Sequence, residues 1–382
     1  MNQQSALTGI RVLDLSRMLP GPYCSMILAD HGADVIAIED KKFQADGLFF
    51  SDLNRNKRHM SLNLKSEEGL AIFFRLAEKA DVILEGFRPG VVKRLGVDYE
   101  AVRRINPGIV YCSISGYGQT GPLADVAGHD VNYLGNAGVL GLIGEKGRQP
   151  VIPGVQLADI AGGGMNAAIG ILLALIARQK SGQGQYIDIS MTDGMVGFLS
   201  LPYYFSSLTG KPPQASDALL SHRYGCYNTY ETADGRYLAL GAVENRFWRG
   251  LCEHVGRPEY IALQYDEERR QEIIDFLRKT FHAKTLGEWE KELAGLDICW
   301  APVKTMDEVL VDPLFQAREM VHTYTDMRGE TRHGFGIPVK MSGTPGSIRT
   351  TPRPFGSATR EILEEIGYSA AEIDGFVAAG VV

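Results

Sequence analysis

The sequence predicts an α/β fold in which a doubly wound parallel sheet is followed by a second unit of mixed helices and strands. Three observations predict this class. Apolar runs of strand length alternate with segments of helical period, the connections have the length of right-handed βαβ units, and the pattern changes near residue 190. A chain of 382 residues also exceeds the usual size of a single hydrophobic core, so two domains are expected.

The first half of the chain carries the predicted sheet. Residues 11–16 (RVLDLS) have the pattern of a buried strand, residues 20–32 have a Pro-Gly-Pro entry and the apolar spacing of a short helix, and residues 34–40 (DVIAIED) form the next strand. The alternation continues with helices predicted at 66–80, 99–105 and 161–180 and with strands at 81–87, 108–115 and 185–191. The pattern therefore predicts parallel strands joined by helices.

The second half predicts a different architecture. Residues 191–225 contain prolines and serines without a steady period, which is typical of a linker or a wrapping arm. From residue 226 onward the residues alternate around Asp234-Gly235, which predicts a hairpin. Helices are expected at 245–255, 266–281, 284–294, 359–366 and 369–378, and strand-like runs at 298–303 (ICWAPV) and 334–341 (GFGIPVKM).

The composition indicates which kinds of binding partner and which cellular compartment to expect. The net charge of −7 argues against nucleic-acid binding, so an anionic ligand would need a local basic patch. The five cysteines are scattered without metal-ligand spacing, which favours a reducing compartment and no metal site. The N-terminus lacks the layout of a signal peptide, and the longest apolar run, 167–177, is too short to span a membrane. We therefore expect a soluble, cytoplasmic protein.

Two segments rich in basic residues are candidates for phosphate binding. The segment 53–66 (LNRNKRHMSLNLKS) contains Arg55, Lys57, Arg58 and His59, and a solvated charged turn is an equally good explanation for it. The segment 85–96 (EGFRPGVVKRLG) adds Arg88, Lys93 and Arg94 after a predicted strand, where α/β sheets bind ligands. Together they favour a polyphosphate ligand, although the chain has no P-loop.

The run 116–121 (GYGQTG) satisfies the GxGxxG pattern of dinucleotide-binding proteins. Pro122 follows directly and no long apolar helix opens there, so a nicotinamide site is not expected. A tight loop that allows a ligand to approach the backbone is the better interpretation.

Three acid–base side chains stand at the junctions of predicted elements, and each has an ordinary structural explanation. His129, in AGHDVNYLG, could be a buried histidine that bonds to a backbone carbonyl. Asp159 precedes a triple glycine that opens a long apolar helix, and it could be a helix cap. The glycines cost about 1 kcal/mol each relative to alanine, which predicts a close approach to the backbone and free N–H groups for an oxyanion. Glu244, between a strand and a helix, could also be a cap.

Taken together, these stretches resemble the family that joins class III CoA-transferases and α-methylacyl-CoA racemases, the CaiB/BaiF-like proteins. The resemblance runs from about residue 6 to 340, and is carried by LTGIRVLDLSRMLPGPYCSMILADHGADVIAIE, EGFRPGVVKRLG, SGYGQTGP, GHDVNYL, LADIAGGGM, GQGQYIDISMTDG and YNTYETADGRYLALGAVENRFW. It is closer to the racemase branch, because the histidine, aspartate and glutamate of that branch are all matched, by His129, Asp159 and Glu244. The glycine-rich run that some transferases carry is also missing from residues 212–228.

The resemblance implies an interlocked, ring-threaded homodimer. Its Rossmann-like large domain is built from both chain ends, and a small α+β domain is inserted between them. The implied divisions are 1–190 for the first part of the large domain, 191–225 for a linker arm, 226–320 for the small domain, 321–332 for a second linker and 333–382 for the return to the large domain. Each active site would combine the large domain of one chain with the small domain of its partner.

Two chemistries are implied by the family. In the racemase branch His129 and Asp159 would face opposite sides of the thioester α-carbon, one removing a proton and the other returning it through an enolate, while Glu244 would orient His129. In the transferase branch Asp159 would instead attack the acyl-CoA carbonyl and form an anhydride that passes CoA between carboxylic acids. A protein that binds CoA without turnover is a third, minor alternative.

The ligand implied is an acyl-CoA thioester, with coenzyme A as part of the substrate and no covalently bound cofactor. Its phosphates would contact Lys41, Lys57, Arg58, Arg88 and Arg94. The pantetheine would run along Gly116 and Tyr117 towards Asp130 and Tyr133.

Overall fold

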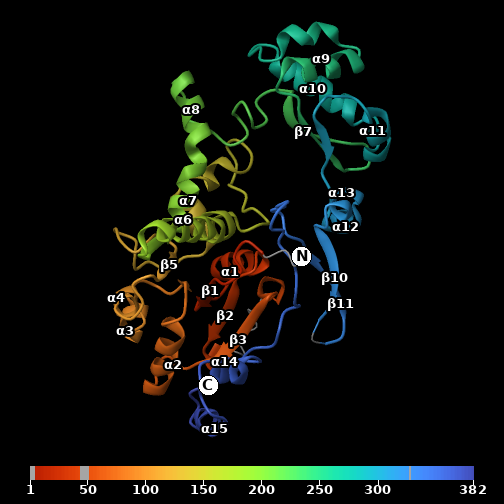
Figure 1. Cartoon of the computed structure of the whole chain (residues 1–382). Helices are drawn as coiled ribbons and strands as arrows, with labels where there is room; N and C mark the ends of the chain where they lie inside the picture. The colour runs from red at the N-terminus through yellow and green to blue at the C-terminus, as the bar shows by residue number, and fades with distance from the viewer. Residues whose placement is uncertain (1–4, 44–50, 327) are drawn as a thin grey trace. The chain divides into compact units, whose positions relative to one another are not determined.

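The computed structural model describes residues 5–43, 51–326 and 328–382. The chain folds into two units (Figure 1). The first unit consists of Met1–Ala137, Gly154–Gly197 and Asp312–Val382, and the second of Gly138–Pro153 and Phe198–Val311.

A six-stranded parallel sheet forms the centre of the first unit. Its order is β3-β2-β1-β4-β5-β6, so the direction of strand addition reverses between β1 and β4. The strands are β1 Arg11–Asp14, β2 Asp34–Glu39, β3 Lys57–Ser61, β4 Val82–Glu85, β5 Val110–Ser115 and β6 Gln185–Ser190. The inner strands are runs of valine, isoleucine and leucine, because helices cover both faces of the sheet. The predicted α/β class with a parallel sheet is confirmed.

Different helices cover the two faces (Figure 1). On one face lie α1 Pro20–Asp30 and α6 Asn166–Ser181, and α6 continues directly from the π-helix η4 Ala158–Met165. On the other face α2 Glu67–Ala77, α14 Thr359–Glu365 and α15 Ala370–Ala378 pack into one apolar core with the sheet. Shorter elements complete the first unit: α3 Val91–Leu95, α4 Tyr99–Arg103, α5 Asp130–Asn136, α7 Met191–Val196, α13 Pro313–Ala317 and the single turns η1 Lys41–Phe43 and η2 Ser51–Asn54.

The basic segment around residue 57 is a strand rather than a turn. It forms β3, which pairs in parallel with β2 and has Lys57 and His59 fully buried. Sequence reasoning missed this strand because charged residues rarely face an interior, and they do so only when other segments supply partners.

The C-terminal part of the first unit also differs from prediction. Residues 321–332, expected as a linker, contribute β10 Val321–Thr325 and the start of β11 Thr331–Phe335, which form an antiparallel pair. The predicted strand at 334–341 is present only as far as Phe335, since Pro338 cannot donate to a ladder.

The second unit contains a three-stranded antiparallel sheet and several helices. The strands β7 Tyr227–Glu231 and β8 Tyr237–Gly241 form the predicted hairpin, in which Gly235 has φ +72°, and β9 Trp300–Pro302 adds to β8. Trp248, Phe281 and Trp289 fill the core. The helices are α8 Ser200–Thr209, α9 Asn245–His254, α10 Arg270–Phe281, α11 Leu286–Leu293 and α12 Met306–Val311, with turns η3 Leu140–Leu142 and η6 Pro258–Leu263. A further turn, η5 Gly197–Leu199, lies at the junction of the two units.

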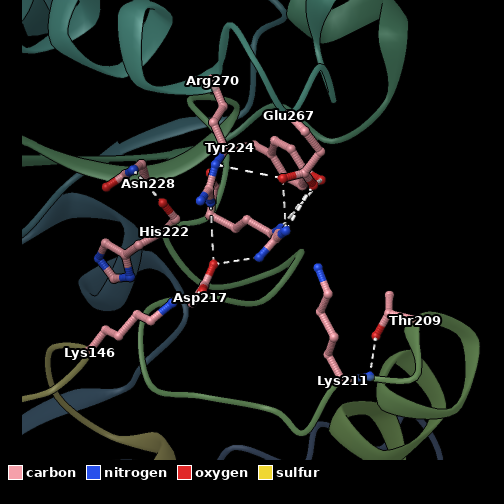
Figure 2. Close-up of polar contacts among 10 residues, drawn as sticks. Lys146, Thr209, Lys211, Asp217, His222, Tyr224, Asn228, Glu267 and Arg270 are labelled. Carbon is pink, nitrogen blue, oxygen red and sulfur yellow. Dashed lines mark hydrogen bonds and ion pairs between the residues drawn. The ribbon is translucent and has the colours of Figure 1, made fainter.

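The arm expected over 191–225 is partly helical, because α7 and α8 occupy its first half. Its second half is held by an ionic cluster around Asp217 in the second unit (Figure 2). The Asp217 carboxylate lies 2.5 Å from Lys146 Nζ, 2.6 Å from Arg223 Nη1 and 3.3 Å from Arg270 Nη1. Arg223 also forms a two-pronged ion pair with Glu267, at 2.9 and 2.8 Å.

In the part of the chain that the structure describes, one long apolar helical segment lies in the first unit. Ala158–Ser181 is long and apolar enough to span a membrane, yet 44% of its most apolar window is buried inside the protein. It packs on β5, β6 and α1, as the core helix of an α/β protein does. Its other side exposes Ile169, Leu173 and Ile176, each by more than half (55%, 62% and 54%).

Candidate active site

A cavity of about 820 Å³ opens in the first unit at the carboxyl ends of β1 and β4. We call it the switch-point cavity, since strand order reverses between these two strands. Parallel sheets bind their ligands at this place, because the loops that follow the two strands turn to opposite faces and leave a crevice. Its walls are residues 17–21 after β1, 86–89 after β4, 114–116 at the end of β5, residues 124 and 126–129 with Asn132 and Tyr133, and Gln156, Asp159 and Met191.

Asp159 is the second residue of η4 and lines this cavity. Its side chain is half-buried, and this burial, together with the neighbouring Asp130 carboxylate, raises its pKa to about 6, although His129 acts in the opposite direction. A carboxyl group that titrates near neutral pH can accept and donate a proton under physiological conditions.

His129 lines the same cavity from the N-cap position of α5. Its backbone N–H donates to Asn132 Oδ1 at 3.0 Å, which fixes the start of the helix, and its imidazole is exposed. The structural alternative of a buried core histidine is therefore wrong. The structure brings His129 and Asp159 to one cavity, close enough for the histidine to influence the pKa of the aspartate.

Asp130 connects the two segments that carry these side chains. Its Oδ1 accepts hydrogen bonds from the backbone N–H groups of Ala158, at 2.7 Å, and Asp159, at 3.0 Å. The amides of Ala158 and Asp159 are therefore not free for an oxyanion. The donors were expected from the glycine-rich helix start after Asp159, and that expectation stays a prediction. The predicted contact of Asp130 with pantetheine would have to use its other oxygen.

The triple glycine serves packing within the chain. A Cβ at Gly162 would lie 2.5 Å from the carbonyl oxygen of Met191, and one at Gly163 would lie 2.8 Å from Cβ of Pro20. A Cβ at Gly164 would lie 2.9 Å from the carbonyl oxygen of Pro20. The close approach predicted from these glycines is therefore real, but α1 and α7 make it rather than a ligand.

Tyr133 packs against the loop that the GYGQTG motif forms. A Cβ at Gly116 would lie 2.4 Å from the Tyr133 ring, and Tyr117 meets the same ring edge to face with centroids 5.3 Å apart. Burial and the nearby Asp159 raise the pKa of Tyr133 to about 12, while Arg88 opposes them. Gly116 and Tyr133 line the cavity, and Tyr117 contacts the Tyr133 ring.

The five predicted phosphate-binding residues divide into two groups. Arg88 is exposed and lines the cavity, Arg94 is exposed on α3, and Lys41 is exposed in η1. Lys57 is fully buried, and Arg58 is held in ion pairs by Asp34, Glu361 and Glu365. Lys57 and Arg58 are thus corrected to structural residues of β3.

Glu244 belongs to the second unit, where it is the exposed N-cap residue of α9. The walls of the switch-point cavity come from the first unit. The pairing of Glu244 with His129 therefore stays a prediction.

Sequence reasoning missed the first βα loop as part of the site. Arg17 and Met18 line the cavity, and Met18 adopts a left-handed backbone with φ +70°, which is strained for a side chain of this size. Asn132, Gln156 and Met191 were missed as well. The position of residues 15–19 directly after the first strand of a parallel sheet was the signal that could have identified the loop.

The fold is an open parallel sheet, and its switch-point cavity is lined by a histidine and an aspartate. This combination is typical of α/β enzymes. The chain belongs to CoA-transferase family III, whose sequence profile matches residues 7–359. The family contains both racemases and transferases of CoA thioesters.

Similar proteins come from both branches. The chain is 37% identical to "Alpha-methylacyl-CoA racemase" of Homo sapiens, over 96% of this chain and 95% of that protein. It is 32% identical to "Succinate--glutarate CoA-transferase" of Agrobacterium fabrum, over 96% of both. Among solved structures, a CaiB/BaiF family protein from Brucella suis superimposes with a TM-score of 0.82 at 30% identity, covering 95% of this chain and 100% of that one.

Proposed function

We propose that this protein racemises 2-methylacyl-CoA thioesters by moving the α-proton through an enolate. The observation that carries the proposal is the pair formed by His129 and Asp159, which line one cavity while the aspartate titrates near neutral pH. The similarity to α-methylacyl-CoA racemases supports the same choice.

The mechanism needs two acid–base groups in opposite protonation states. The unprotonated group takes the α-proton, the C–H electron pair moves into the enolate, and the protonated group delivers a proton to the opposite face. After one turnover the two groups have exchanged protonation states. A carboxyl group with a pKa of about 6 can hold either state near neutral pH, so Asp159 can serve in both directions.

The second candidate is CoA transfer, favoured by the similarity to succinate–glutarate CoA-transferase. The Asp159 carboxylate would attack the thioester carbonyl, the C–S bond would break, and CoA would leave as the thiolate while the acyl group stays on Asp159 as a mixed anhydride. This chemistry requires Asp159 but leaves the α-proton in place.

Coenzyme A enters this proposal as part of the substrate. Arg88, at the cavity wall, and the exposed Arg94 and Lys41 are the basic side chains that would meet its phosphates, without Lys57 or Arg58. Gly116, Tyr117, Tyr133 and the second oxygen of Asp130 would border the pantetheine. No covalently bound cofactor is required.

We include an interlocked homodimer in the proposal, and a second copy of the chain is the partner. Support comes from apolar surfaces on each unit: Leu173 of α6 is 62% exposed, and Tyr203 and Leu208 of α8 are 74% and 64% exposed. Exposed apolar patches of this kind are typical of protein–protein interfaces. Glu244 would then complete the site from the partner chain, and the buried free thiols of four cysteines are in keeping with a cytoplasmic location.

The deciding experiment incubates an enantiopure 2-methylacyl-CoA with the protein in deuterium oxide. Racemase activity predicts α-deuterium incorporation and loss of optical purity without an acceptor acid. Both should be lost in Asp159→Asn and, in at least one direction, in His129→Ala. Undiminished exchange in both variants would contradict the assignment.

The same preparation tests the alternative. Transferase activity predicts an unchanged α-carbon, passage of CoA to a free carboxylate such as succinate, and trapping of an acyl adduct at Asp159 by hydroxylamine. His129→Ala should then retain most of the transfer rate, because the anhydride route does not use the imidazole.

A further inference from the structure

A buried ammonium group lies beneath the first βα loop. Lys57 of β3 is fully buried, and its Nζ donates to the carbonyl oxygen of Pro22 at 2.9 Å and to Asn54 Oδ1 at 3.4 Å. A buried charge is tolerated only when its surroundings replace most of the hydration it has lost. Pro22 stands in the first turn of α1, so the lysine holds the beginning of that helix.

The counter-charge is Asp14, the last residue of β1. Its Oδ2 lies 3.8 Å from Lys57 Nζ and accepts the hydroxyl of Ser25, while its Oδ1 accepts the backbone N–H of Ser16 at 2.9 Å and the Ser16 hydroxyl. We call Lys57, Asp14, Ser16 and Ser25 the buried network. The loop 15–19 connects β1 to α1. The buried network fixes both of its ends: Ser16 just after β1, and the first turns of α1.

This loop and the start of α1 are walls of the switch-point cavity. Residues 17–21 line it, and Met18 is held in a left-handed conformation between the two ends that the buried network fixes. Gly21 packs directly on Ser16, since a Cβ there would lie 2.0 Å from Ser16 Oγ. The loop shape therefore depends on contacts at both of its ends.

The same segment supports the helix that carries Asp159. Gly163 and Gly164 of η4 pack on Pro20, the first residue of α1, so closely that an added Cβ would lie 2.8 Å from its Cβ and 2.9 Å from its carbonyl oxygen. A shift at the start of α1 is thus transmitted to η4, because neither side has space to absorb it.

We propose that Lys57 is a positioning residue for catalysis: through Asp14 and Pro22 it sets the conformation of residues 16–21 and the seat of η4, without touching the substrate. The proposal rests on the proposed function in assigning Asp159 to the reaction. It replaces the prediction from sequence that Lys57 binds a phosphate of coenzyme A.

The protonation of Lys57 provides an independent readout. Burial lowers its pKa to about 8, against the opposing influence of Asp14, Cys24, Glu39 and Asp30, the groups that face it. The ammonium form is the one that donates to Pro22 and balances Asp14. A positioning role therefore predicts that kcat falls as the pH rises through about 8. The unfolded chain holds the Lys57 proton more tightly than the folded chain does. The free energy of unfolding therefore does not fall as the pH rises through about 8.

The test compares Lys57→Met, which keeps the length of the side chain but loses its charge, with Lys79→Met at an exposed position on the same unit. For Lys57→Met we expect kcat of the native reaction to fall by about tenfold or more, as a small misplacement of reacting groups does. The affinity for adenosine 3′,5′-bisphosphate, measured by calorimetry, should stay within about threefold of the native value. The decline of kcat above pH 8 should disappear, and amide hydrogen exchange should quicken in residues 15–21.

If Lys57→Met does not fold because Asp14 loses its partner, Asp14→Asn/Lys57→Met removes both charges and is compared with the native protein in the same way. A fall in bisphosphate affinity that matches the fall in kcat would show that Lys57 binds phosphate and would overturn the proposal. So would a kcat equal to that of Lys79→Met. If the native protein catalyses neither exchange nor transfer, the proposed function fails, and amide exchange in residues 15–21 alone decides for or against Lys57.

Discussion

The surroundings of the Asp159 carboxyl suit a proton-transferring group but make the folded protein less stable. Burial and the Asp130 carboxylate raise its pKa to about 6, so ionisation costs more in the folded chain than in the unfolded one. Asp130 cannot move away, because its Oδ1 holds the amides of Ala158 and Asp159. This unfavourable pair of carboxylates is the kind of feature that active sites retain for reactivity.

Asp159→Asn should therefore be more stable than the native protein above pH 6 while losing activity. As the pH rises from about 4 to about 6 the unfolded chain releases the Asp159 proton first, so native stability falls over this window and then levels. Asparagine lacks this dependence. At pH 7 we expect the free energy of unfolding of Asp159→Asn to exceed that of the native protein by about 1 kcal/mol, a value already reduced for the partial solvation of the side chain. Near pH 3.5 the two proteins should be equally stable. Denaturant unfolding at the two pH values measures the difference, and an equal gain at both would contradict this origin.

Single residues differed in how far the sequence could predict them. His129 and Asp159 were identifiable, because their neighbours form long motifs at element junctions. Lys57 was assigned to the wrong role, since a lysine beside an arginine is usually solvated and its partners, Asp14 and Pro22, are distant in sequence. Which lysines are buried depends on tertiary packing and not on local pattern.

At the scale of elements, η4 is shaped by the close packing of its glycines against α1 and α7. Gly162→Ala would place a Cβ 2.5 Å from the Met191 carbonyl oxygen, and backbone cannot yield as a flexible side chain does. The strain of about 1–3 kcal/mol exceeds the helix-propensity gain of about 1 kcal/mol, so the variant should be less stable.

Gly375→Ala is the matched control, because Gly375 lies inside α15 with no atom within 4 Å of the added Cβ. The same substitution should stabilise there by up to about 1 kcal/mol. Thermal unfolding of the two variants should give shifts of opposite sign. A stabilised Gly162→Ala would mean that α7 can move away at little cost.

Elements with a regular apolar period were predictable, and elements held by distant partners were not. The strands β1, β2, β4 and β5 and the helices α2, α9 and α11 match their patterns, since each buries a continuous apolar run or stripe. The strand β3 was missed because its inward side chains are charged, and α8 because its apolar residues face outward. The exposed face of α8 is consistent with the partner chain that we propose.

At the scale of the whole molecule, the ionic cluster at Asp217 ties together three distant segments of the second unit. Lys146 comes from 138–153, Arg223 from the arm and Arg270 from α10, around Asp217 (Figure 2). The Ser216 hydroxyl also donates a hydrogen bond to the Gly144 carbonyl at 2.6 Å. Asp217→Asn leaves these three cations without their shared anion. We expect it to lower the free energy of unfolding by about 1–2 kcal/mol, which is between exposed and buried ion pairs.

Asp307→Asn, at an exposed position in α12, is the control and should change stability little. Burial raises the pKa of Asp217, but Lys146 and Arg223 outweigh burial, so the pKa in the folded protein lies below its ordinary value. The stabilisation that the Asp217 carboxylate gives the fold is therefore complete above about pH 4, and it is lost as the pH falls through the pKa of Asp217 in the folded protein. The difference between Asp217→Asn and the native protein should therefore shrink below pH 4. A difference that does not shrink as the pH falls below 4 would point to lost packing.

The sheet order and the position of the cavity follow from rules that a sequence can carry, because parallel strands joined by helices permit few topologies. The assignment of 138–153 to the second unit was not predictable, since the Lys146–Asp217 ion pair and a hydrogen bond from the Ser216 hydroxyl to Gly144 connect it, rather than an apolar pattern. The interlocked dimer and the place of Glu244 in the site depend on a second chain and remain predictions.

The excursion of 138–153 also determines how the protein can be divided. The chain passes between the two units at residues 137/138, 153/154, 197/198 and 311/312. The first two of these passages both lie between His129 and Asp159 in the sequence. One proteolytic nick at any of these passages divides the residues of the first unit between two fragments. Excising 198–311 to obtain the sheet alone would leave 138–153, between His129 and Asp159, without the rest of its unit. The second unit is therefore not a module that evolution or an engineer could exchange by a single cut and splice.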